Sequence, residues 1–103
     1  MDTSQKDEFL ITQIIFMFQA AALQQMGKLK SPLSDKVERD LNQAQISIDI
    51  LDVLHRKMKG NLTMEEDKMF TQVLQELRLN YVDEAAKKEP QPEPAPPNPP
   101  TNS

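Results

Sequence analysis

One short segment near the middle of the chain constrains the fold more than any other: Lys59-Gly60-Asn61-Leu62-Thr63-Met64-Glu65-Glu66. Gly60 has no Cβ, so it can adopt the positive φ that often closes a helix. Thr63 and Glu66 have the spacing of a capping box, in which each side chain bonds to the backbone N–H of the other residue. The segment therefore predicts a helix that ends just before Gly60, a tight corner, and a new helix that begins just after Thr63.

The composition of the 103 residues favours helices and argues against several kinds of site. There are only two glycines, one tyrosine and no tryptophan, and the net charge is −4. The absence of cysteine excludes disulfides and thiolate metal sites and fits a reducing compartment. Lysine and arginine are scattered and no basic stripe carries interleaved aromatic residues, which argues against nucleic acid as a partner.

The N-terminal segment Phe9–Leu23 is apolar except for Thr12, Gln13 and Gln19. It is too short for a membrane span, and the acidic residues before it do not suit a secretory signal. We expect a helix over residues 5–26, with Ser4 as its cap and Gly27 as its stop. A helix that is apolar almost all round must be covered almost all round. Two other helices of the same chain can cover only one side of it.

The surplus apolar surface of this helix predicts an oligomer. Phe9, Phe16, Ala20 and Leu23 lie on one side of the helix. The other apolar stripe is the interface that we predict with a second copy or another protein, and it comprises Ile11, Ile14, Ile15, Phe18 and Ala22.

The remaining helices are predicted over residues 35–59, capped by Ser34 or Asp35, and 64–86. The first has a regular apolar seam, formed by Val37, Leu41, Ala44, Ile48, Leu51, His55 and Met58. It also has a second apolar patch on the opposite side, formed by Ile46, Ile50 and Val53. The helix over 64–86 has one apolar face, formed by Phe70, Val73, Leu74, Leu77 and Tyr81. The fold class is therefore all-α: residues 1–86 form a three-helix domain in which the last two helices make an antiparallel hairpin.

Residues 87–103 form a proline-rich tail that we expect to be disordered and to sample polyproline II. Its P-x-x-P spacings arise in any dense run of prolines. A solubilising tail is the simpler interpretation, and a docking segment for a partner is the alternative.

Three residues invite a chemical interpretation. His55 has no nucleophile within a recognisable triad, so we predict no catalytic residue and no cofactor. Asp52 and His55 lie one turn apart and could hold a metal in a dimer, although they diverge on the helical wheel. Arg78 is expected either to pair with a carboxylate of a neighbouring helix or to anchor a partner.

Several of these motifs together resemble a known family. They are Ile48-Asp49-Ile50-Leu51, the run Lys59–Thr63 with Glu66, Leu77-Arg78 and Tyr81-Val82. This pattern resembles a family of small bacterial proteins catalogued as a domain of unknown function, number eighteen-forty-four, over roughly residues 9–83. Met58 stands where the family pattern has threonine. The resemblance implies a bacterial, cytoplasmic, helical domain and transfers no catalytic residue.

Three functional hypotheses follow. The first is a non-enzymatic interaction or structural protein that self-associates through its N-terminal helix. The second is a regulatory adaptor that presents the helical face or the proline-rich tail to a larger partner. The third is a small metal-dependent enzyme that uses Asp52 and His55.

Overall fold

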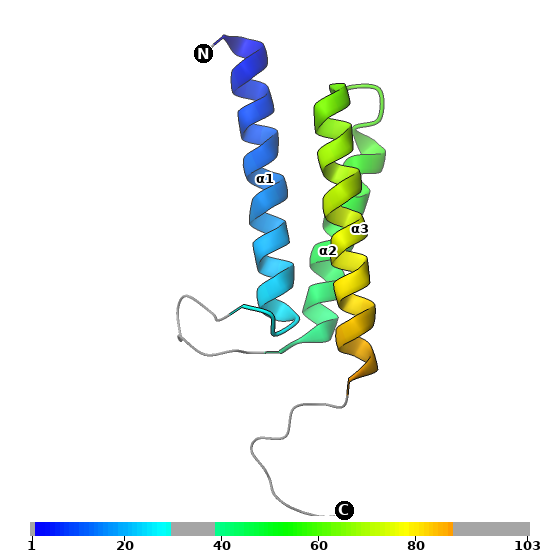
Figure 1. Ribbon diagram of the computed structural model, residues 1–103. Coiled ribbons are helices and arrows are strands. Elements are labelled where there is room, and N and C mark those ends of the chain that lie inside the picture. The colour runs from blue at the N-terminus through cyan, green and yellow to red at the C-terminus, as the bar shows by residue number, and fades with distance from the viewer. Residues whose placement is uncertain (1, 30–38, 88–103) are drawn as a thin grey trace, which may run out of the picture.

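The computed structural model describes residues 2–29 and 39–87, and these ranges contain three helices and no strand. They are α1 (Thr3–Gln25), α2 (Leu41–Lys57) and α3 (Met64–Ala86). α2 and α3 form an antiparallel hairpin, and α1 lies alongside both (Figure 1). The predicted all-α, three-helix architecture is confirmed. The proline-rich residues 89–103 lie outside the described ranges.

All three helices contribute to one apolar core. α1 supplies Ile15 and Ala22, and Met26 follows directly after it; α2 supplies Ala44, Ile48 and Leu51; and α3 supplies Phe70, Val73, Leu74 and Leu77. The seam predicted for the second helix is thus the row of α2 that faces the core, and Leu41 and Met58 extend it as partly buried residues. Val37 lies outside the described residues.

The corner between α2 and α3 has the predicted structure. Gly60 has φ +89°, and the N–H of Asn61 donates to the carbonyl oxygen of Met58 at 2.9 Å. Thr63 and Glu66 form the complete capping box: the Thr63 N–H donates to Glu66 Oε1 at 2.8 Å, and the Glu66 N–H donates to Thr63 Oγ1 at 3.1 Å. The first four backbone N–H groups of a helix have no partner within the helix. The box pairs one of them, the N–H of Glu66, and also pairs the N–H of Thr63, the residue before the helix.

Two predicted helix starts are wrong. α1 begins at Thr3 rather than near residue 5, because Asp2 and Gln5 form a capping box ahead of the cap expected at Ser4. α2 begins at Leu41 rather than at residue 35, with Asp40 as its N-cap. The Asp40 N–H donates to the carbonyl oxygen of Gln25 at 2.7 Å, so the end of α1 holds the chain in a non-helical conformation at this point. Ser34 and Asp35 lie outside the described residues.

The end of α1 agrees with the prediction of a stop at Gly27. Gly27 has φ +89°, the N–H of Lys28 donates to Leu23 O at 2.8 Å, and the N–H of Gly27 donates to Gln24 O at 3.0 Å. This pair of bonds is the Schellman motif.

The corner generates a stability prediction at Gly60. A Cβ added there meets no atom within 4 Å, so the only cost of Gly60→Ala is its positive φ. We expect Gly60→Ala to lower the free energy of unfolding by about 1–2 kcal/mol. Gly60→Asn is the matched control and should lose less, because asparagine tolerates positive φ better. Urea unfolding measures both variants, and a stability equal to that of the native protein in both of them would contradict the account.

Candidate interaction surface

The side of α1 that points away from the core remains apolar. We call Phe9, Leu10, Phe16 and Met17 the outer face of α1; Phe16 is 46% exposed and Met17 64% exposed. Ile14 lies at the edge of this face and is 39% exposed. No charged residue occurs between positions 9 and 27. The outer face is therefore an uncharged surface that extends along most of the helix.

The spacing of these residues is that of a helix-pairing seam. Phe9 and Phe16 are seven residues apart, and so are Leu10 and Met17, with the exposed Gln13 and Ala20 on the same side. A repeat of seven residues keeps side chains on one stripe of a helix, where they can pack into a facing helix. Ala20 adds a small side chain at which another backbone could approach closely.

The structure places the predicted interface residues differently from the expectation. Ile15 and Ala22 are fully buried inside the chain, and Ile11 and Phe18 pack against the core as partly buried residues. Only Ile14 of the five is exposed. The predicted stripe is thus mainly the inner face of α1. Polar residues interrupt both sides of the helix: Gln13 is exposed on the outer face, whereas Thr12 and Gln19 are half-buried and lie within about 60° of Ile15 on the helical wheel. The polar residues of the segment therefore do not distinguish its two sides.

A second exposed apolar row lies on α2. Ile46, Ile50 and Val53 follow the spacing i, i+4 and i+7, and Ile46 is 48% exposed. With Leu54 and Asp49 they line a shallow hollow on the surface of the helix. This row is the second apolar patch expected for this helix.

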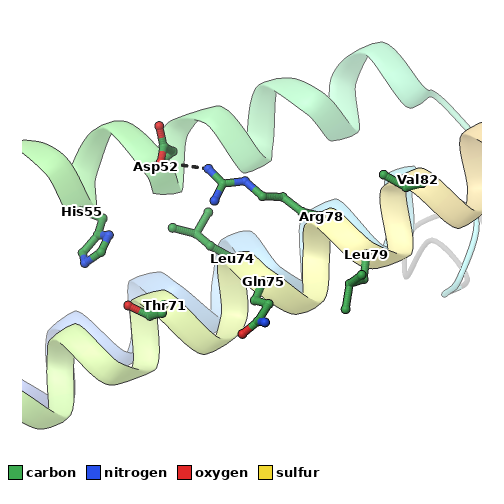
Figure 2. A pocket seen from close by; sticks show the side chains of 8 residues that line it. All are labelled: Asp52, His55, Thr71, Leu74, Gln75, Arg78, Leu79 and Val82. Carbon is green, nitrogen blue, oxygen red and sulfur yellow. Dashed lines mark hydrogen bonds and ion pairs between the residues drawn. The ribbon is translucent and has the colours of Figure 1, made fainter.

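The groove between α2 and α3 is lined by both polar and apolar side chains. Arg78 Nη2 donates to Asp52 Oδ1 at 2.9 Å (Figure 2). Arg56 Nε donates to the other oxygen of the same carboxylate, Asp52 Oδ2, at 3.0 Å. These bonds, from Arg56 first and then Arg78, lower the pKa of Asp52 below its ordinary value. The expected pairing of Arg78 with a carboxylate of a neighbouring helix is confirmed.

His55 is part of the same hairpin packing. Its Nε2 lies 2.7 Å from Asp67 Oδ1, and its ring stacks on Phe70 with centroids 5.2 Å apart. Asp52 and His55 point away from one another in Figure 2 and have different partners. Within residues 2–29 and 39–87, no group of three or more histidine, aspartate or glutamate side chains is placed to hold a metal ion. The geometry therefore gives the metal hypothesis no support.

A polar cluster that we did not predict from the sequence lies at the end of the bundle opposite the Gly60 corner. Glu84 is only 8% exposed, and its Oε2 lies 2.9 Å from Lys28 Nζ and 2.8 Å from Lys87 Nζ. Arg39 Nη2 donates to the backbone carbonyl oxygen of Glu84 at 2.6 Å. The bonds from Lys87 and Lys28 lower the pKa of Glu84 below its ordinary value of 4.5. The cluster ties the end of α1 and the start of α2 to the last turn of α3.

The lowered pKa of Glu84 predicts an acid-dependent contribution to stability. A carboxyl group with a lowered pKa in the folded state stabilises the fold above its unfolded pKa and loses this contribution as the pH falls through the folded pKa. Glu84→Gln should lower the free energy of unfolding at neutral pH by about 1–2 kcal/mol. It should also flatten the decline of stability below pH 4.5. Denaturant titrations across this range test both effects. Glu76→Gln, on the exposed side of α3, is the control, and identical acid profiles for native and Glu84→Gln proteins would contradict the assignment.

In the part of the chain that the structure describes, no helix combines the length and apolar character needed to cross a bilayer.

Comparison with known proteins identifies the family of this chain. No curated protein and no solved structure matches the chain. A family model described as a domain of unknown function, DUF1844, matches residues 8–83, which include all of α2 and most of α1 and α3. The resemblance seen in the sequence is confirmed, and the chain belongs to the DUF1844 family.

Proposed function

We propose that this protein is a non-enzymatic helical interaction protein that associates with a second copy of itself through the outer face of α1. The observation that carries the proposal is this uncharged face, with Phe9, Phe16 and Met17 exposed on a helix whose other side already forms the core. Contiguous exposed apolar surfaces of this kind mark interaction sites in soluble domains.

Burial of the exposed halves of these side chains would favour association. Full burial of a large apolar side chain contributes about 1.5–3 kcal/mol, so covering the exposed half of each of the four outer-face residues and of Ile14 contributes several kcal/mol in each chain. Association costs on the order of 4–15 kcal/mol in lost translational and rotational freedom. Contributions from two chains are of the same size as this cost, which makes association of two copies feasible.

A second copy suits this face because the face is self-complementary. A two-fold interface brings the same residues of both chains together, so a charged patch would repel itself, whereas an uncharged one does not. An antiparallel pair of α1 helices also places the positive end of each helix dipole beside the negative end of the other. The acidic residues Asp7 and Glu8 then lie near the end of the partner helix that precedes Lys28.

The ionisable residues of the α2–α3 groove support a non-enzymatic role. Asp52 is bonded to two arginines, and His55 is held between Asp67 and Phe70. These interactions join α2 to α3 and account for the polar side chains that were candidates for catalysis.

The proposal predicts the effect of a charge on the outer face. Phe16→Glu should weaken association by about 3 kcal/mol or more, since each dimer would bury two unpaired carboxylates. Size-exclusion chromatography with light scattering should find a dimer for the native protein and a monomer for Phe16→Glu at the same concentration. Phe16 is the better probe than Phe18, because Phe18 packs against the core and its replacement would also destabilise the monomer.

Leu79→Glu is the matched control, because Leu79 is 68% exposed on α3. It should leave the dimer intact. A native protein that is folded and monomeric at micromolar concentration would refute the proposal, and so would a Phe16→Glu variant that remains dimeric.

A further inference from the structure

We infer that the second copy covers the exposed row of α2, formed by Ile46, Ile50 and Val53, together with the outer face of α1. This inference rests on the proposed self-association and specifies which surface takes part in it. It enlarges the interface from one helix to the α1–α2 pair.

The position of the α2 row relative to the other helices is the first argument. Ser47 Oγ lies 2.7 Å from the side-chain amide of Gln25, so this side of α2 faces α1. Asp52 and His55 bond to Arg78 and Asp67, so that side faces α3. At 100° per residue, Ile50 lies about 60° from Ser47 and about 160° from Asp52, whereas Val53 lies about 100° from Asp52. The exposed row therefore points out of the bundle, and Ile50 is its member nearest to α1.

The outer face of α1 approaches this row through Ile14. Gln25 contacts α2, and Ile14 precedes it by eleven residues, which is close to three full helical turns. Ile14 therefore lies on the side of α1 that faces α2, and it is still partly exposed. It stands between the outer face of α1 and the row on α2, so the two surfaces adjoin along the α1–α2 pair.

The exposed area is the second argument. If a fully exposed large side chain presents on the order of 200 Å², the outer face of α1 with Ile14 exposes roughly 500 Å². By the same measure the α2 row adds roughly 250 Å². A standard stable interface buries about 800 Å² on each partner. The outer face of α1 falls short of this area alone, whereas the combined surface approaches it.

The polar residues near the row have the arrangement of an interface rim. Asp49 also lines the apolar hollow, and at 100° per residue it lies to one side of the row, beyond Val53. Its Oδ1 accepts a hydrogen bond from Gln45 Nε2 at 2.9 Å. Polar side chains at the border and apolar side chains at the centre are typical of interfaces between proteins. The bond to Gln45 keeps the carboxylate of Asp49 paired at the border.

Two-fold symmetry makes this surface compatible with itself. α1 and α2 run antiparallel (Figure 1). When two such pairs pack face to face about a two-fold axis in the interface, α1 lies over either α1 or α2 of the second copy. In both arrangements the facing helices run antiparallel, which is favourable for their dipoles.

Sedimentation equilibrium of four proteins tests the inference: native, Phe16→Glu, Ile50→Glu and Val82→Glu. Ile50→Glu should raise the dimer dissociation constant at least about tenfold, since it places a charge within the buried surface. Val82→Glu, at an exposed residue of α3 that lines the α2–α3 groove, should change the dissociation constant by less than about twofold. Circular dichroism and thermal unfolding establish that each variant is folded.

A thiol footprint provides a second measurement, because the chain has no cysteine of its own. In an Ile50→Cys variant, maleimide should react slowly at concentrations where the dimer forms and faster after dilution to monomer. In a Val82→Cys variant, the rate should be the same at both concentrations.

The outcomes separate the inference from the proposed function. If Phe16→Glu dissociates the dimer while Ile50→Glu leaves it intact and Ile50→Cys reacts equally fast at both concentrations, α2 is outside the interface and only the inference fails. Dissociation by Val82→Glu as well would show an effect of charge unrelated to this surface, and would also overturn the inference. A monomeric native protein would refute both statements.

Discussion

A bundle of three helices can bury only one side of each helix, and α1 is apolar on two. Its inner face, with Ile15 and Ala22, forms the core together with α2 and α3. Its outer face keeps Phe9, Phe16 and Met17 in contact with water. Removing apolar surface from water lowers the free energy, so the exposed apolar side of α1 is the physical reason to expect association. The rest of the fold holds α1 in the position that leaves this side exposed.

Polar interactions at both ends fix the α2–α3 hairpin against which α1 packs. At one end, the capping box of Thr63 and Glu66 starts α3 directly after the corner. At the other end, Glu84 joins Lys28, Arg39 and Lys87. Between them, the Asp52–Arg78 pair links α2 to α3. The Asp52–Arg78 pair and the Glu84 cluster thereby lie on the α2–α3 side and at one end of the bundle, while α1 has no charged residue between Phe9 and Gly27.

Local signals in the sequence are sufficient for most of the fold. The corner depends on Gly60, Thr63 and Glu66, which lie close together in the chain, and a spacing of four and three residues identifies the core row of α2. These features can be predicted correctly because neighbours along the chain determine them. The family is also recognisable, since its motifs cluster around the same corner.

Structural features that depend on contacts between residues far apart in the sequence cannot be predicted from local signals. The buried Glu84 is paired with Lys28 and Arg39, which lie far away in the sequence, so no local pattern indicates the cluster. The predicted start of α2 is too early, because the bond from Asp40 to Gln25 forms only after α1 has packed. The two sides of α1 are exchanged in the prediction, because hydrophobicity alone does not state which apolar side faces inward.

Sedimentation equilibrium of the unmodified chain over a range of micromolar concentrations tests the central claim most directly. We predict a mass that rises with concentration from that of one chain, 11.8 kDa, to twice that value, as expected if a second copy covers the α1–α2 surface. A folded protein whose mass stays at 11.8 kDa throughout the range would contradict the claim.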